Sequence, residues 1–224
     1  MIFWIVLFAL VVLISFLLAL RSMADFVHQP PVRSVLFLIR LPRGLNLAVL
    51  NSMHDLMRQK GAVFSLERLI KGKESALVIY GPPEILNNFR EALNLLELED
   101  YTGVDPNLLQ AWEIGARKGQ PVKSINSFFK GLPAFSENEQ LWWQLVLKAQ
   151  NLTGDERFFQ GQIRVVASSS LPQLKNPATD DLTKVPRPFT RESIIDFYQE
   201  RSFLENKLNP ILTADAVLKL ISLV

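Results

Sequence analysis

The chain has 224 residues, 49% of them hydrophobic, and its 24 Lys and Arg residues nearly balance its 22 Asp and Glu residues. This balance gives no bulk positive charge for a nucleic-acid-binding surface. The lack of cysteine excludes disulfides, thiolate metal sites and a cysteine nucleophile. Two histidines, His28 and His54, leave little material for a histidine-built metal site.

The first segment has the pattern of a membrane anchor. Segment 2–20 contains no charged residue, proline or glycine, and as a helix it spans roughly 28 Å, which matches a bilayer core. The alternative is a cleaved secretory signal, for which residues 22–24 resemble a cleavage site. However, the apolar segment is long for a signal and no basic residue precedes it. We therefore expect a single-pass transmembrane helix over residues 1–21.

The residues after the apolar segment predict its orientation in the membrane and a spacer before the soluble part. Arg21, Arg33, Arg40 and Arg43 all lie after the apolar segment, and positive charge near a span is retained on the cytoplasmic side. Residues 22–33 include V-H-Q-P-P, a stiff extended linker. The soluble part is therefore expected to face the cytoplasm.

Residues 34–103 alternate strand and helix signals. Apolar and β-branched runs predict strands, while apolar residues at helical spacing predict helices. The order is strand, helix, hairpin of two strands, helix and strand, at residues 34–41, 47–60, 62–70, 75–80, 83–93 and 95–101. A βαββαβ order predicts a ferredoxin-like α+β unit, in which two helices cover one face of a four-stranded antiparallel sheet.

A second small α+β unit is predicted over residues 104–170. It contains strands, two of them a hairpin, and one helix, at residues 108–117, 139–148, 160–168 and 124–132. Residues 171–188 hold four prolines among polar residues, which predicts a linker.

The final part, residues 189–224, is predicted to be a helical tail. Thr190 and Thr213 are suited to cap two helices, which run to about residue 207 and over 214–224. The second helix carries an apolar stripe at Ala216, Val217, Leu220, Ile221 and Val224. An apolar end is either packed or cut from something longer. Because Asn209-Pro210 separates the stripe from the preceding helix, we expect it to dock a partner rather than its own domain.

Few residues in the sequence suggest a catalytic, cofactor-binding or metal-binding site. The chain has no G-x-x-x-x-G-K-[ST], G-x-S-x-G or H-E-x-x-H pattern. His54-Asp55 is interpreted as structural rather than as an acid/base pair. The acidic cluster of Glu97, Glu99 and Asp100 is interpreted as a solvated strand edge rather than as a cation site. We therefore predict no catalytic residue, cofactor or metal.

The adjacent tryptophans Trp142 and Trp143 lie in a predicted strand. Since neighbouring side chains in a strand point to opposite faces, one ring should enter the core and the other should meet a neighbouring element or a partner. Nucleic-acid stacking is disfavoured because few basic residues lie nearby. The partner-binding candidates are Trp142, Trp143, Val217, Leu220, Ile221 and Val224.

Four stretches carry a resemblance to a known family: V-L-F-L-I-R-L-P at 35–42, F-S-L-E at 64–67, L-E-D-Y-T at 98–102 and E-N-E-Q-L-W-W-Q-L-V-L at 137–147. With the tail I-L-T-A-D-A-V-L-K-L at 211–220, the chain resembles the N-terminal, membrane-anchored region of HerA/FtsK-like and VirB-type conjugation (type IV secretion) ATPases. In that family the nucleotide-binding motifs follow this region, whereas this sequence ends where they would begin. No catalytic residue is therefore carried over.

The resemblance implies a non-catalytic, membrane-tethered scaffold or docking module of a DNA or protein translocation machine. Its partner would be a P-loop ATPase module or a second copy of the chain. The alternative is a membrane-anchored sensor or ligand-binding module, because the ferredoxin-like fold hosts many functions. A hydrolase with a dispersed active site is disfavoured because no nucleophile and base can be paired.

Overall fold

The computed structural model describes residues 33–103, 109–116, 121–122, 135–150, 157–168, 182–184, 190–205 and 208–222, together with Ser15. Residues 1–32 form one compact unit and residues 33–224 form another. Apart from Ser15, the predicted transmembrane helix lies outside the described residues, as does the linker up to residue 32. Among the helices that the structure does describe, none is long and apolar enough to cross a membrane.

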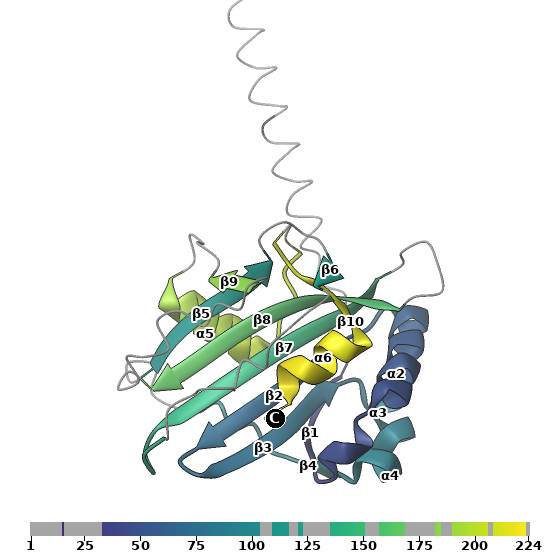
Figure 1. The fold of residues 1–224 in the computed structure, drawn as a ribbon, viewed down its shortest axis with the longest axis horizontal. Coiled ribbons are helices and arrows are strands. Elements are labelled where there is room, and N and C mark those ends of the chain that lie inside the picture. Colours follow the sequence, from purple (N-terminus) through teal and green to yellow (C-terminus); the bar gives the residue numbers. More distant parts are fainter. Residues whose placement is uncertain are drawn as a thin grey trace, which may run out of the picture. The chain divides into compact units, whose positions relative to one another are not determined.

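One mainly antiparallel β-sheet organises residues 33–224 (Figure 1). In the described residues it has ten strands: β1 (Val35–Ile39), β2 (Val63–Lys71), β3 (Glu74–Gly81), β4 (Leu95–Glu97), β5 (Leu109–Ala116), β6 (Pro121–Val122), β7 (Gln140–Gln150), β8 (Phe158–Ser168), β9 (Leu182–Lys184) and β10 (Ile211–Thr213). The order is β4-β1-β3-β2-β7-β8-β10-β6. In addition, β5 pairs with β8 and β9 pairs with β5. The pairing of β10 with β6 is parallel.

Helices lie on both faces of this sheet (Figure 1). The described α-helices are α2 (Leu47–Lys60), α3 (Pro83–Leu86), α4 (Arg90–Leu93), α5 (Arg191–Glu200) and α6 (Ala214–Ile221), with 3-10 turns η1 (Pro42–Gly44) and η2 (Asn87–Phe89). The predicted caps Thr190 and Thr213 accept bonds from the backbone N–H groups of Ser193 and Ala216. The predicted helix to residue 207 ends earlier, at Glu200, because Arg201 adopts a left-handed φ of 52°.

The element order predicted for residues 34–103 is found. Strands β4-β1-β3-β2 are neighbours in that order and all three pairs are antiparallel. Two details differ. The predicted helix over 83–93 is divided into α3, η2 and α4, and the last strand stops at Glu97 instead of continuing to residue 101.

The two predicted soluble units share this sheet instead of forming separate bodies. Strand β2 pairs with β7 along its whole length, from Val63 opposite Lys148 to Lys71 opposite Gln140. The predicted linker also needs correction, because β9 lies within it and pairs with β5. The rest of that linker and the helix predicted over 124–132 lie outside the described residues.

The face of the sheet that α2 and α6 cover is apolar, and we call it the apolar face. Alternate residues of the central strands point to it, and with the two helices they form the main buried cluster, including Leu50, Met53, Phe64, Leu66, Trp143, Leu145, Phe159 and Ile163. Packing is close at Gly161 of β8, where an added Cβ would lie 2.7 Å from a Leu212 methyl group. Glycine is needed there so that β10 can lie against β8.

The tail completes this core, which corrects the prediction that it docks a partner. Val217 and Leu220 are fully buried and Ile221 is 3% exposed, all within the main apolar cluster. The guanidinium of Arg68 donates from Nε and Nη2 to the Ile221 carbonyl, at 3.1 and 2.8 Å. The stripe buries its apolar surface on the chain's own sheet because that face is otherwise uncovered beside α2. Val224 lies outside the described residues.

Candidate functional site: a buried polar row and a neighbouring hollow

The opposite face of the sheet carries a line of buried polar side chains. Glu67 of β2 lies opposite Gln144 of β7, Gln144 lies opposite Arg164 of β8, and Arg164 lies opposite Glu113 of β5. The first three are fully buried and Glu113 is 3% exposed. We call these four residues the polar row. Because side chains alternate along a strand, the sequence neighbours of each member point to the other face, and these neighbours are apolar except for Arg68.

Glu67 is the centre of the hydrogen bonding. Its Oε1 accepts from the Ser65 hydroxyl at 2.5 Å, from Gln144 Nε2 at 3.1 Å and from Arg201 Nε at 3.0 Å. Its other oxygen accepts from the Tyr101 hydroxyl. A buried carboxylate is tolerated when donors and a cation surround it, as they do here.

Arg164 continues the network toward the segment after α5. Its Nη1 donates to Gln144 Oε1 and to the Phe197 carbonyl, both at 2.9 Å, and its Nη2 donates to the Ser202 carbonyl at 2.5 Å. The guanidinium thereby binds one carbonyl in the last turn of α5, which also accepts backbone N–H bonds from Arg201 and Ser202, and one carbonyl just after the helix.

Two further contacts hold the same segment. Gln144 Nε2 donates to the Tyr198 carbonyl at 2.8 Å, and Gln162 Oε1 accepts from the Leu204 backbone N–H at 2.9 Å. The second carboxylate of the row, Glu113, accepts from Gln162 Nε2 at 2.5 Å. The polar row and Gln162 thus fix the backbone of residues 197–204 to the sheet.

Two carboxylates flank the buried guanidinium of Arg201. Arg201 lies between Glu67 and Asp100, 2.9 Å from an oxygen of the latter, and over the ring of Tyr80 at 4.7 Å. Burial alone would lower the pKa of Arg201, but the carboxylates of Glu67 and Asp100 outweigh it and raise that pKa. Burial opposes ionisation of Asp100, yet hydrogen bonds from Arg201 and Thr102 leave its pKa below the ordinary value.

The tyrosines of the network stay protonated. Burial raises the pKa of Tyr101 and Tyr198 well above 10.0, and the nearby Glu67 carboxylate acts in the same direction. Their hydroxyl groups lie 2.8 Å apart. Because Tyr101 donates to Glu67, it can accept from Tyr198, and both hydroxyls are satisfied in one chain of hydrogen bonds.

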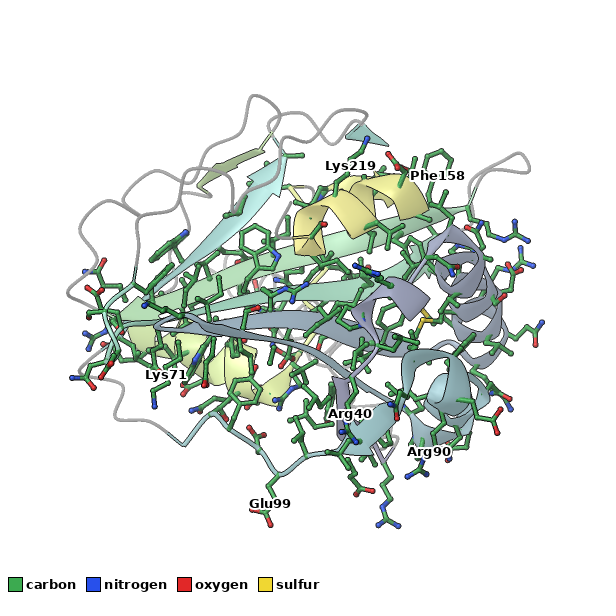
Figure 2. The ribbon with its side chains drawn as sticks, turned by 60° about the horizontal axis from the view of Figure 1, so that its bottom comes forward. Arg40, Lys71, Arg90, Glu99, Phe158 and Lys219 are labelled. Carbon is green, nitrogen blue, oxygen red and sulfur yellow. The ribbon has the colours of Figure 1, made fainter. Side chains whose placement is uncertain are left out.

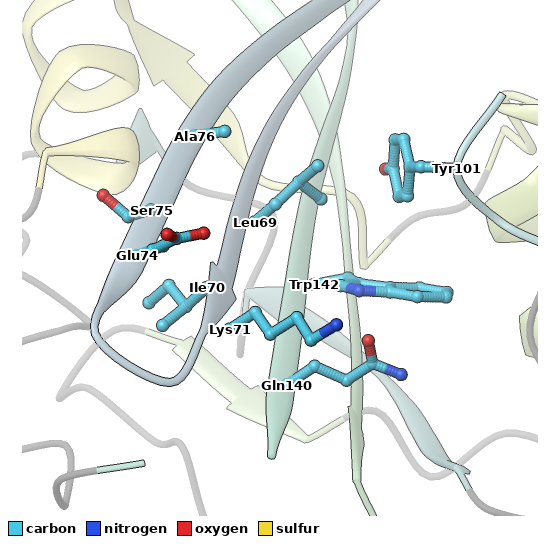
Figure 3. Close-up of a pocket in the computed structure, with 9 residues that line it drawn as sticks. All are labelled: Leu69, Ile70, Lys71, Glu74, Ser75, Ala76, Tyr101, Gln140 and Trp142. Carbon is cyan, nitrogen blue, oxygen red and sulfur yellow. The ribbon is translucent and has the colours of Figure 1, made fainter. Parts of the chain in front are cut away.

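A hollow of about 420 Å³ adjoins the network at the β2–β3 hairpin (Figure 3). Its walls include Leu69, Lys71, Ala76, Tyr101, Gln140 and Trp142. The Tyr101 ring stands edge-on to Trp142, with centroids 5.4 Å apart, and Trp142 lies 5.8 Å from Tyr198. Tyr101 therefore belongs to both features, with its ring on the hollow and its hydroxyl on Glu67.

The structure places the predicted tryptophans on opposite faces, as the strand alternation predicts. Trp143 is fully buried in the main apolar cluster. Trp142 is 5% exposed, packs against Tyr101 and Tyr198, and lines the hollow. As placed, Trp143 offers no surface to a partner, which corrects its assignment as a binding residue.

His54 is buried in the core, and within the acidic cluster Asp100 forms an ion pair. His54 is 3% exposed, its Nε2 lies 3.0 Å from the Phe158 carbonyl, and its ring stands edge-on to Phe159. Of the cluster, Glu97 and Glu99 are exposed while Asp100 pairs with Arg201. No group of three potential metal ligands occurs in the part of the chain that the structure describes.

Sequence reasoning missed the polar row, although a signal was present. A charged or amide residue lies within each of three largely apolar strand centres: Glu67 in F-S-L-E-R-L, Gln144 in W-W-Q-L-V and Arg164 in Q-I-R-V-V. A charge on the buried face of a central strand requires a partner. The partners, residues 197–204 and Tyr101, are distant in sequence, so their identity could not be predicted from the strands.

The hydrogen bonds of the polar row are made to other groups of the same chain. The Ser65 hydroxyl donates to Glu67 rather than facing a histidine base, and each carboxylate oxygen of Glu67 is already occupied by donors.

The sequence matches no protein-family model, and no curated protein matches it closely enough to count as a relative.

Proposed function

We propose that the chain is a non-catalytic, membrane-tethered docking module of a conjugation-type translocation machine whose ATP hydrolysis is supplied by a P-loop ATPase partner. The observation that carries this proposal is the polar row. Its charged and amide groups are used in fixing residues 197–204 to the sheet. Such a network favours one rigid arrangement of a platform over a site that must exchange substrate.

The topology and the sequence add support. We infer that strands β4-β1-β3-β2 with α2 to α4 are a ferredoxin-like unit, extended on the β2 side by β7 and β8. Segment 2–20 supplies the tether, and the resemblance to the N-terminal region of conjugation ATPases supplies the class of partner. The tail is not part of the proposed docking surface, because its stripe is buried.

Membrane attachment and partner capture test the proposal together. The full-length chain should stay with membranes through carbonate washing, because the apolar segment leaves a bilayer only at high cost. Cross-linking in its native host followed by purification should recover a P-loop ATPase. Release by carbonate would refute the tether, and recovery of other proteins without any P-loop ATPase would refute the docking role.

An assay of ATP hydrolysis separately tests the proposal that the chain is non-catalytic. Purified full-length protein should hydrolyse ATP no faster than a mock preparation, because the sequence has no phosphate-binding loop. Hydrolysis that rises in proportion to the protein through successive purification steps would overturn this part alone.

A further inference from the structure

The hollow beside the β2–β3 hairpin has the features of a small binding site. Its volume of about 420 Å³ lies in the range of ligand pockets. It lies beside Tyr101 and Trp142, where β2 ends and β3 and β7 begin (Figure 3). Leu69 and Ala76, opposite each other in the β2–β3 register, supply apolar floor.

Two hydrogen-bond donors lie on the Trp142 side of the hollow. Lys71 and Gln140 are directly opposite each other on β2 and β7. Figure 3 shows the Lys71 ammonium directed toward Gln140 and Trp142. Among the described residues, neither side chain has a hydrogen-bond or ion-pair partner. Glu74 also lines the hollow, opposite Lys71 in the β2–β3 register. Its carboxylate lies on the side away from Trp142 (Figure 3), so the proposed anionic end lies on the Lys71–Gln140 side.

The walls and donors together specify a ligand chemistry. Trp142, which is 5% exposed, and Tyr101 line the hollow with parts of their rings, and aromatic walls pack well against planar rings. An ammonium beside an amide N–H₂ group favours an anionic oxygen at that end. We propose that the hollow binds a planar aromatic group bearing a carboxylate, with the ring against Trp142 and Tyr101 and the carboxylate on Lys71 and Gln140. This assignment goes beyond the docking role and does not depend on it.

Titrations of the full-length protein in detergent test the site. The Trp142 indole N–H signal in NMR spectra, identified by its loss in Trp142→Phe, should shift on addition of indole-3-acetate or of acetyl-Asp-Phe amide. Tryptophol, which keeps the ring but lacks the carboxylate, should bind about threefold to fivefold more weakly than indole-3-acetate. Binding of the peptide alone would identify a partner segment as the source of the ring, and binding of the free acid would identify a small ligand.

Two lysines of the same hairpin provide matched variants. Lys71→Gln should weaken indole-3-acetate binding by about threefold to fivefold, while Lys73→Gln, exposed in the turn and outside the hollow, should leave it unchanged. Equal losses in both variants would show non-specific charge attraction and overturn the site. So would an unmoved Trp142 signal with both probes at about 10 mM. Neither result bears on membrane attachment or ATPase capture.

Discussion

Glu67 is fully buried and shares its hydrogen bonds with residues from β2, β7 and the segments around Tyr101 and Arg201. At the scale of single residues, substitution of either this carboxylate or one of its partners is expected to lower the stability of the fold. Removing one partner of a buried ion pair leaves the other charge without compensation in a poorly solvated place. The polar row therefore has more effect on stability than its small number of members suggests.

We predict that Glu67→Ala lowers the free energy of unfolding by about 3–5 kcal/mol, because it removes the fully buried carboxylate partner of Arg201 and leaves only that of Asp100, which is largely exposed. Urea titration of the full-length protein in detergent measures the change. Glu99→Ala, at an exposed position, serves as the control and should change stability by less than about 0.5 kcal/mol. A loss in Glu67→Ala no larger than in the control would contradict the central role of Glu67.

Asp55 of α2 forms a different kind of ion pair, at the surface. Arg157, just before β8, donates from Nε and Nη2 to its two carboxylate oxygens at 2.9 and 2.8 Å. These bonds, opposed by slight burial and aided by His54, lower the pKa of Asp55 from 3.8 to about 2. The folded state therefore favours the ionised carboxylate more than the unfolded chain does.

A depressed pKa stabilises the fold above the unfolded value of 3.8, and that stabilisation is lost as the pH falls toward about 2. We predict that the stability difference between the natural protein and Asp55→Asn is greatest at neutral pH and shrinks between pH 3.8 and about 2. Urea titrations at several pH values measure it. Arg157→Gln should remove most of this pH dependence; if the dependence persists in that variant, another group causes it.

At the scale of elements, α6 shows how an apolar stripe finds its cover. Its inward residues join the main cluster on the apolar face, while Lys219 on its outer side pairs with Asp215 at 2.7 Å (Figure 2). The partially exposed outer side is polar because only the inner side is removed from water. The short helix is therefore stabilised mainly by packing on the sheet.

Leu220→Ala is accordingly predicted to lower stability by about 2–5 kcal/mol, because it leaves a cavity in a fully buried position. Lys219→Ala, its exposed neighbour, should cost less than about 0.5 kcal/mol. The two thermal unfolding midpoints provide the comparison. Similar midpoints would mean that the helix is not packed as described and would favour a tail that docks a partner.

Local signals in the sequence predicted most of the elements, but not their partners. The hairpin of β2 and β3 around Gly72, the strands β7 and β8, and the capping threonines all follow from short stretches of sequence. The pairing of β2 with β7 joins segments far apart in the chain and has no local signature. The same holds for Arg201, whose role depends on a glutamate at position 67.

At the scale of the whole unit, one continuous sheet joins the elements of residues 33–224, with α2 and α6 on its apolar face and α5 on the other. The β2–β7 pairing joins parts that the sequence suggested were independent. Elements that share one sheet and one core generally unfold together, because each loses its cover when the other opens.

This continuity predicts a single cooperative unfolding transition for residues 33–224. Tryptophan fluorescence, measured in a Trp4→Phe background so that it reports on the strand residues Trp112, Trp142 and Trp143, and far-ultraviolet circular dichroism should give the same urea midpoint within error. Two separated transitions would show that β1–β4 and β7–β8 unfold as distinct bodies, despite their shared hydrogen bonds.

The place of α6 on the sheet also has a consequence for synthesis. The ribosome makes β2, β7 and β8 well before residues 214–221, so the apolar face they share with α6 is complete before this cover exists. A nascent chain at that stage exposes apolar strands, the kind of surface that chaperones bind and that aggregates when left open. Translation pauses ahead of residue 214 would lengthen this vulnerable interval, and fast synthesis of the tail would shorten it.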